Sequence, residues 1–250
     1  MQVGHVTIRL YGDLASLAPD ADNDGAVEVP VGGRRSVKDA VEAAGVPHTE
    51  VDLLVVDGDV VDFGAQVGPG DRVAAYPPLH SLDIDSPVRP PPLAEPRFIL
   101  DVHLGRLAGQ LRLLGLDVEY DNDRGDAELA RRAAAGPRWL LTRDRGLLMR
   151  AAVTHGYLVR TTDPDEQLLE VARRFQLGPH LRPFRRCAHC NGMLEDVDKE
   201  AIAHRLEPGT RREHDTFRRC TGCGQLYWAG SHLPSIEALL ERVRAAGAPE

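Results

Sequence analysis

The chain has 250 residues, 42% of them hydrophobic and 27% charged, and a formal net charge of −8. This composition is typical of a soluble globular protein with one large domain or two smaller ones. The start, MQVGHVTIRLYGD, has no apolar signal segment, and no run approaches the length of a membrane span. We therefore expect a cytoplasmic protein with no membrane contact, in which thiols stay reduced.

Charge is unevenly distributed along the chain. Residues 1–96 carry 6 basic and 16 acidic side chains, whereas residues 173–219 carry 11 basic and 7 acidic ones. Local charge, and not the net charge, decides whether a surface binds phosphate. The second stretch is therefore a candidate RNA-binding region, in which arginines are concentrated: Arg173, Arg174, Arg182, Arg185, Arg186, Arg211, Arg212, Arg218 and Arg219.

Residues 1–80 predict a ubiquitin-like β-grasp domain. HVTIRLYGDL alternates apolar and polar residues as a half-buried strand does, and GAVEVPV can pair with it. Ser36 is placed to cap an amphipathic helix, VKDAVEAA, that ends at Gly45. LLVVDGDVVD contains the Asp-Gly of a tight hairpin, and GPGDRVAAYPP supplies a last strand.

This order of strands and helix is similar to that of the small sulfur carriers of thiamine and molybdopterin synthesis. Those carriers end in a free Gly-Gly, whereas this chain continues through YPPLHSLDID, so sulfur transfer is not expected. An interaction or RNA-positioning module is the preferred interpretation, and a merely solubilising appendage is the alternative. Residues 81–96, SLDIDSPVRPPPLAEP, are expected to be a linker stiffened by Pro90–Pro92.

Residues 97–180 predict an α/β domain with a parallel sheet. Three short apolar runs each end near an aspartate that is followed by a helical pattern, and these acids are Asp101, Asp126 and Asp144. Because the carboxyl ends of parallel strands share one edge, we expect the three carboxylates to converge there. Clustered carboxylates repel one another unless a cation neutralises them, and hard oxygen ligands suit Mg²⁺ or Mn²⁺.

A structural alternative exists for each of these acids, because aspartate is also a preferred helix N-cap. Carboxylate-held metals mostly serve phosphate chemistry, which also needs cations near the substrate. Arg106, Arg112, Arg143 and Arg145 flank the acids and could hold phosphates. For Arg112 a solvated helix face is an equally good interpretation.

The runs ILDVHLGRLAGQLRLLGLDVEY, DAELA and LLTRDRGLL resemble the mutator-seven C-terminal RNase domain, a member of the PIN-like nucleases. The resemblance extends from Arg97 to about His232. It implies a PIN-like three-layer α/β parallel sheet with an appended zinc ribbon, in which Asp101, Asp126 and Asp144 bind the divalent metal. A fourth acid is common in such sites, and either Glu128 or Asp163 could supply it. The implied activity is RNA cleavage.

Residues 181–233 predict a zinc ribbon. All four cysteines fall in two C-x-x-C pairs, Cys187/Cys190 and Cys220/Cys223, and four thiolates can surround a structural Zn²⁺. Disulfides, a redox pair and an iron–sulfur cluster fit the compartment or the spacing less well. His189 and His232 are not expected to be ligands.

The chain ends in two further helical patterns. DEQLLEVARRFQLG carries an apolar stripe, Leu168, Leu169, Ala172 and Phe175, that predicts core packing. Residues 234–250 predict a terminal helix that starts at Pro234 and docks through Ile236, Leu239, Leu240 and Val243. Tyr227 and Trp228 are candidates for base stacking, with packing against the second cysteine pair as the alternative.

The combined prediction is a cytoplasmic, metal-dependent endoribonuclease with structural Zn²⁺ and catalytic Mg²⁺ or Mn²⁺. Its candidate substrate contacts are Arg106, Arg143, Arg145, Arg186 and Arg219. RNA, for instance tRNA or ribosomal RNA, is the expected partner, and the β-grasp domain could bind a protein. Two alternatives stay open: a non-catalytic RNA- or ribosome-binding protein, and an adaptor in tRNA or sulfur chemistry.

Overall fold

The computed structural model describes residues 4–79, 84–91, 93–136, 138–230 and 233–248. Packing divides these residues into two compact units that are both discontinuous in sequence. Unit 1 comprises residues 1–92 and 126–158, and unit 2 comprises residues 93–125 and 159–249. Within the described ranges, every helix is too short or too polar to cross a lipid bilayer.

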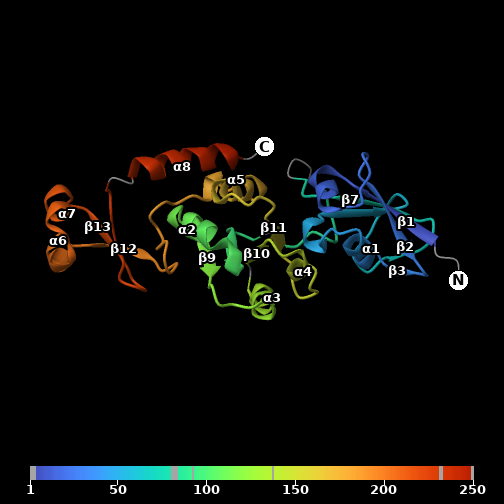
Figure 1. Cartoon of the computed structure of the whole chain (residues 1–250), viewed down its shortest axis with the longest axis horizontal. Coiled ribbons are helices and arrows are strands. Elements are labelled where there is room, and N and C mark those ends of the chain that lie inside the picture. The colour runs from blue at the N-terminus through green and yellow to red at the C-terminus, as the bar shows by residue number, and fades with distance from the viewer. Residues whose placement is uncertain (1–3, 80–83, 92, 137, 231–232, 249–250) are drawn as a thin grey trace. The chain divides into compact units, whose positions relative to one another are not determined.

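Unit 1 begins with a five-stranded sheet in the order β2-β1-β7-β4-β5 (Figure 1). Strand β1 (Gly4–Leu10) runs antiparallel to β2 (Ala26–Val31) and parallel to β7 (Arg72–Tyr76). Strand β4 (Leu53–Val56) is antiparallel to both β7 and β5 (Asp59–Val60). With helix α1, this arrangement is the predicted ubiquitin-like β-grasp, here called the β-grasp part (residues 4–79).

The local sequence explains where these elements start and stop. The Ser36 hydroxyl accepts a hydrogen bond from the Asp39 amide (3.1 Å) and so caps α1 (Val37–Ala43), as predicted. Gly45 ends the helix region with a φ of 95°. In the β4–β5 turn, Asp57 and Gly58 both have positive φ, 49° and 102°, as a two-residue type I′ hairpin requires.

Four short elements complete the β-grasp part. Strands β3 (Arg35–Ser36) and β6 (Gln66–Val67) pair antiparallel, and η1 (Gly12–Leu17) and η2 (His48–Glu50) are short 3₁₀ helices. Fully buried Val6, Ile8 and Leu54 belong to its hydrophobic core. The burial of alternate residues along β1 is what the sequence pattern predicts.

The described residues of the proline-rich linker, 84–91 and 93–96, are not a free spacer throughout. Val88 is buried, and Arg89 donates through Nε to Oδ2 of Asp52 at 2.8 Å. The ring of His155 also contacts this segment, with Nε2 3.0 Å from the carbonyl oxygen of Pro91. Residues 81–83 and Pro92 of the predicted linker lie outside the described residues.

Unit 1 continues with two strands and two helices from residues 126–158. Strand β10 (Trp139–Thr142) pairs in parallel with β11 (Gly156–Leu158). Helix α3 (Asp126–Ala135) precedes β10, and α4 (Arg145–Leu148) connects the two strands. Parallel pairing with a helical crossover is the arrangement predicted for this region.

Turn η2 of the β-grasp part contacts β11 and the loop before it through buried polar groups. The carboxylate of Glu50 accepts a hydrogen bond from the Leu158 amide at 2.5 Å. The Nε2–H of His48 donates to the carbonyl of Val153 at 2.9 Å, and its Nδ1 lies 2.7 Å from the Glu42 carboxylate. His48 and Glu50 are only 6% and 2% exposed. No pattern in the sequence indicates this contact.

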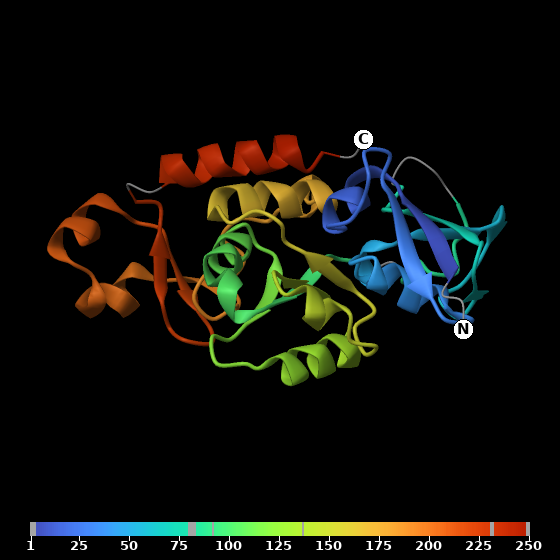
Figure 2. The ribbon, with the colours of Figure 1, turned by 45° about the vertical axis from the view of Figure 1, so that its right-hand side comes forward.

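Unit 2 contains the second parallel pair, β8 (Arg97–Leu100) and β9 (Asp117–Tyr120), with Leu100 opposite Tyr120. Its helical elements are η3 (Val102–Leu104), α2 (Gly105–Leu113), α5 (Pro164–Arg174), η4 (Gly178–His180) and α8 (Leu233–Ala246). Helix α5 packs against both α2 and α8, and α8 runs alongside α5 in both views (Figures 1 and 2).

The two apolar stripes predicted for α5 and α8 are used for packing. Leu168, Leu169 and Ala172 are buried on α5, and the Phe175 ring packs edge-on against Phe98 with centroids 5.1 Å apart. On α8, Leu240 and Val243 are buried, while Ile236 and Leu239 are partly buried. The prediction that these stripes are core-facing is confirmed.

The last substructure of unit 2 is an antiparallel three-stranded sheet in the order β12-β13-β14 (Figure 1). Its strands are β12 (Leu194–Val197), β13 (Phe217–Cys220) and β14 (Leu226–Trp228). The long insert between the cysteine pairs contains α6 (Lys199–Ile202), η5 (Ala203–Arg205) and α7 (Pro208–Glu213). Ile202, Phe217 and Leu226 form a small hydrophobic core beneath this insert. The predicted fold class, a β-grasp followed by an α/β region with parallel strands, is confirmed.

Candidate functional site

The four cysteines form one compact cluster in the three-stranded sheet region. The Sγ atoms of Cys187, Cys190, Cys220 and Cys223 all lie within 4.8 Å of one another. Two of these distances are 3.6 Å (Cys187 to Cys223) and 3.3 Å (Cys190 to Cys220). Tetrahedral coordination with Zn–S bonds of about 2.3 Å places sulfurs about 3.8 Å apart. The donor set and its spacing therefore fit a structural Zn²⁺.

The two C-x-x-C turns have the same backbone construction. The residue after each second cysteine, Asn191 or Gly224, has a left-handed φ of 67° or 74°. Its amide donates to the carbonyl of the first cysteine, at 2.9 Å to Cys187 and 3.0 Å to Cys220. Asparagine and glycine are the residues that adopt this conformation most readily. The sequence C-x-x-C-[Asn/Gly] thus specifies both turns, here called the first and second knuckle.

Close backbone approach surrounds the sulfurs with hydrogen-bond donors. A Cβ atom at Gly192 would lie 2.8 Å from the Cys220 sulfur, so only glycine fits there. The amides of Gly222 and Cys223 donate to this sulfur at 3.3 and 3.4 Å. Burial raises the pKa of the Cys220 thiol, but the Cys223 amide, the Cys190 thiol and the Gly222 amide together outweigh it and lower the pKa to about 7. The thiolate, which binds metal, is thereby favoured at this position.

The first knuckle is bound to the α/β core of unit 2 by a buried arginine. Arg112 of α2 is 5% exposed and donates to the carbonyls of Val118 (3.0 Å) and His189 (2.7 Å). Burial lowers the pKa of its guanidinium. Neither interpretation of Arg112 from the sequence, phosphate contact or solvated helix face, is correct. A helical pattern cannot reveal that carbonyls of a distant loop will cover one of its polar residues.

Asn191 and Arg186 form a second link from the first knuckle to β9. The Asn191 side chain accepts from the Val118 amide at 3.1 Å and donates to Asp117 at 2.8 Å. Arg186 donates to the Asn191 carbonyl at 3.0 Å, and its Nη2 lies 3.4 Å from the Asp117 carboxylate. Arg186, a predicted substrate contact, therefore already has protein partners.

Tyr227 packs against the first knuckle. The alternative to base stacking that was drawn from the sequence was packing against the second knuckle. Its hydroxyl lies 3.1 Å from the Cys187 sulfur and accepts from the Ala188 amide at 3.0 Å. Burial, followed by the contact with Cys187, raises the pKa of this phenol. The neighbouring Trp228 is 40% exposed and its ring tilts against Phe217 at 6.2 Å. His189 is exposed and outside the cysteine cluster, and His232 lies outside the described residues.

The predicted acidic residues of unit 2 follow strands β8 and β11. Asp101 directly follows β8, is 4% exposed, and accepts from the His103 amide at 2.7 Å as the N-cap of η3. Asp163 is exposed and caps α5 through the amides of Asp165 (2.9 Å) and Glu166 (3.1 Å). Both acids thus have the capping role that was the alternative to metal binding.

The predicted acidic residues of unit 1 also have local partners. Asp144 follows β10 and caps α4, accepting from the amides of Gly146 (2.7 Å) and Leu147 (3.4 Å). Asp126 is the exposed first residue of α3, and its carboxylate lies 3.9 Å from Arg150. Glu128 pairs with Arg131 one turn later, at 2.7 Å.

The predicted acidic site combines residues of both units, so the convergence of their carboxylates stays a prediction. Asp101 and Asp163 belong to unit 2, whereas Asp126, Glu128 and Asp144 belong to unit 1. Among the residues that the structure describes, the cysteine cluster is the group of three or more potential metal ligands whose ligand atoms all lie within 4.8 Å of one another.

The remaining predicted arginine contacts differ in their surroundings. Arg145 starts α4 and lies beside the β-grasp part, because a Cβ atom at Gly45 would be 3.2 Å from its Nη1. The other three are exposed, on α2, on the turn after β10 and on β13: Arg106, Arg143 and Arg219.

Comparison with known proteins assigns both parts of the chain. Residues 96–240 match the Mut7-C RNAse domain, and residues 3–83 match the Mut7-C ubiquitin domain. Among solved structures, small archaeal modifier protein 1 of H. volcanii is 24% identical, covering 30% of this chain and 99% of its own, with a TM-score of 0.26. The curated proteins include no match.

The RNAse-domain match spans more than half of the chain and includes all four cysteines and every predicted acid. The preceding ubiquitin-like domain agrees with the β-grasp seen in unit 1. The RNAse domain suggests a nuclease, in the general class of hydrolases. The chain belongs to the Mut7-C RNAse domain family, with a Mut7-C ubiquitin domain at its N-terminal side.

Proposed function

We propose that this protein is a cytoplasmic, metal-dependent ribonuclease that hydrolyses RNA phosphodiesters with carboxylate-bound Mg²⁺ or Mn²⁺. The family match over residues 96–240 carries the proposal. The positions of the acids support it, because Asp101 and Asp144 lie just beyond the carboxyl ends of parallel strands β8 and β10. Ligands of α/β proteins bind at such strand ends.

In this mechanism Asp101, Asp126 and Asp144 hold the metal, with Glu128 or Asp163 as the fourth acid. Oxygen ligands and retained waters are the coordination that Mg²⁺ prefers. When bound, the metal would activate water and stabilise the leaving oxygen. Asp101 is suited to this role because its carboxylate is buried and lies directly beyond the carboxyl end of β8.

The cysteine cluster would serve as a structural zinc site that supports an RNA-binding surface. Four sulfur ligands leave no open position, so this metal would not take part in cleavage. The segment of residues 173–219 carries 11 basic and 7 acidic side chains, which favours phosphate contact. Exposed Arg219 on β13 and Arg106 on α2 are the candidates for such contacts.

Asparagine substitutions separate metal binding from capping at the two clearest positions. Asn caps helices about as well as Asp, so Asp101→Asn and Asp144→Asn should keep the caps seen here while removing one ligand charge each. We expect RNA cleavage in Mg²⁺ or Mn²⁺ to fall at least about 100-fold, with thermal stability and zinc content unchanged. Asp198→Asn, at the start of α6, is the matched control and should cleave normally.

Two results would contradict the proposal. One is full activity of both Asn variants, and the other is a native protein that cleaves no RNA in either metal. A labelled structured RNA and a labelled single strand, assayed over a Mg²⁺ and Mn²⁺ series, provide the measurement. Zinc content per chain, measured on the same samples, separates loss of the ribbon from loss of the catalytic site.

A second function, RNA or ribosome binding without cleavage, is favoured by one observation. Asp101, Asp144 and Asp163 all accept backbone amides as helix caps. If capping is their whole role, the native protein binds RNA but does not cleave it at any Mg²⁺ or Mn²⁺ concentration. The ubiquitin-like domain would then act as an adaptor that recruits a protein partner in tRNA or sulfur chemistry.

A further inference from the structure

We propose that residues 182–186 form a binding site for one unpaired nucleotide, with the base on one side of this segment and its phosphate on the other. This inference rests on the proposed function, because it assigns a position to the RNA. The segment, Arg-Pro-Phe-Arg-Arg, lines two cavities of opposite character. Phe184 lines the first cavity and the next residue, Arg185, lines the second, and consecutive Cα atoms are about 3.8 Å apart.

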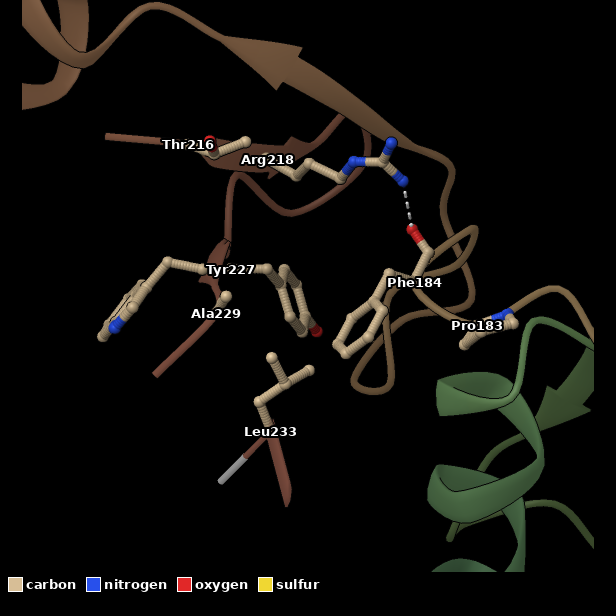
Figure 3. Close-up of a pocket in the computed structure, with 8 residues that line it drawn as sticks. Pro183, Phe184, Thr216, Arg218, Tyr227, Ala229 and Leu233 are labelled. Atoms are coloured by element: carbon tan, nitrogen blue, oxygen red, sulfur yellow. Dashed lines mark hydrogen bonds between the residues drawn. The ribbon is translucent and has the colours of Figure 1, made fainter. Parts of the chain in front are cut away.

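The first cavity, called the aromatic pocket, has a volume of about 300 Å³. Its walls include the side chains of Phe184, Tyr227 and Leu233, which lie around a common space (Figure 3). Flat apolar walls of this kind suit a nucleobase, because unpaired bases stack on aromatic rings. The Tyr227 ring is fixed there by the bonds of its hydroxyl to the first knuckle.

Phe184 is held in a backbone conformation that non-glycine residues seldom adopt. Its φ is +58°, in the left-handed region. The amide donates to the Leu113 carbonyl at 3.2 Å, and the carbonyl accepts from Arg218 Nη1 at 3.0 Å (Figure 3). Strained conformations of this kind cluster at active sites and ligand sites, where the surroundings enforce them. Here hydrogen bonds fix both the amide and the carbonyl of Phe184, and its ring points into the aromatic pocket.

The second cavity, called the polar pocket, has a volume of about 70 Å³. Its charged lining consists of four basic and two acidic residues: His180, Arg182, Arg185, Arg186, Glu95 and Asp117. Because Arg186 is paired with Asp117, exposed Arg182 and Arg185 supply the cations for a phosphate. The pocket is large enough for a phosphate group but not for a base.

The segment between the pockets is rigid for a structural reason. The amides of Arg182 and Phe184 donate to the carbonyls of Leu114 and Leu113, so the segment caps the end of α2. Gly115 makes this possible, because a Cβ atom there would clash with the Arg182 carbonyl. A site on such a support is preorganised, which lowers the entropic cost of binding. A duplex would not fit, because its bases are already stacked within the helix.

The test uses the full-length, zinc-loaded protein and a short single-stranded RNA that contains one 2-aminopurine. No Mg²⁺ or Mn²⁺ is added, so that the RNA stays intact. Stacking quenches the fluorescence of this base, which reports on the aromatic pocket directly. We expect Phe184→Leu to lose the quenching and to bind about 5- to 100-fold more weakly, whereas Phe184→Trp retains both.

Arg185→Gln tests the phosphate side at an exposed position where folding is not at risk. Its plot of log affinity against log salt should be shallower by about 0.7, and Arg242→Gln, exposed on α8, should leave the slope unchanged. The inference is overturned if Phe184→Leu quenches and binds as the native protein does, or if a duplex of the same sequence quenches equally. Quenching without cleavage would refute only the proposed nuclease, whereas cleavage with no effect of Phe184→Leu would refute only this site.

Discussion

The guanidinium of Arg112 donates a 2.7 Å hydrogen bond to the carbonyl oxygen of His189, inside the first C-x-x-C turn. Because Arg112 also donates to the Val118 carbonyl, one buried side chain connects α2, β9 and the first knuckle. The cysteine cluster is therefore attached to the α/β core of unit 2 and is not a separate appendage. A substitution of Arg112 should therefore affect both the cysteine cluster and the α/β core.

Arg112→Met should destabilise the protein although the new side chain is apolar and similar in length. It leaves the carbonyls of Val118 and His189 without a donor, and the free energy of unfolding should fall by about 2–4 kcal/mol. Urea titration of the zinc-loaded protein measures the change. Arg106→Met, exposed on the same helix, is the control and should change stability by less than about 0.5 kcal/mol. Equal stability of the two variants would disprove the role assigned to Arg112.

Removal of zinc should unfold the three-stranded sheet before the rest of the chain. The hydrophobic cluster at Leu194 includes Cys187 and Cys220, and the other core of the sheet, formed by Ile202, Phe217 and Leu226, is too small to stabilise it without a metal. Chelation should abolish protection of the β13 amides from hydrogen exchange while those of β1 stay protected. Cys223→Ser should produce the same pattern in the presence of zinc. Full protection of β13 after chelation would show that the metal is not structural.

Substitutions at Asn191 should separate backbone strain from side-chain hydrogen bonding. Asn191→Gly keeps the left-handed φ but loses the bonds to Val118 and Asp117, at a cost of about 1–2 kcal/mol. Asn191→Ala adds the steric cost of this φ, about 1–2 kcal/mol more. Urea titrations measure the free energy of unfolding of both variants. Gly224→Ala is the corresponding substitution in the second knuckle and should carry the same steric cost. Alanine as stable as glycine at residue 191 would contradict the conformation described here.

Glu50→Ala should weaken the contact between the β-grasp part and β11. The Leu158 amide would lose its acceptor in a buried position, so unfolding should become easier by about 1–3 kcal/mol. Hydrogen exchange at Leu158 should accelerate, while exchange at Leu141 in β10 changes little. Glu28→Ala, on β2 at the far side of the β-grasp part, is the matched control.

Much of the fold could be predicted because its signals are local. Ser36, Asp57-Gly58 and Gly45 specify a cap, a hairpin turn and a helix end through their own backbone preferences, and the structure has each of them. The two C-x-x-C pairs predicted the cysteine cluster for the same reason, since each knuckle is built from consecutive residues.

The features that could not be predicted depend on partners distant in sequence. Arg112 looks like any helical arginine until the first knuckle, more than 70 residues later, covers it. Phe184 acquires its unusual backbone conformation from Leu113 and Arg218, on either side of it in sequence. The packing of Val88 and Arg89 likewise could not be predicted, because it depends on the surroundings of Asp52.

The bond from Glu50 to the Leu158 amide has a consequence for the evolution of the chain. Strand β11 pairs with β10 on one side, and the acid from the N-terminal part satisfies a backbone group that would otherwise face solvent. Strand β11 is an edge strand, so a descendant that lost the first 80 residues would present an uncovered strand edge, the kind of surface that promotes aggregation. Any relative that lacks the N-terminal part should therefore carry a replacement for this acid, or a shorter strand in place of β11.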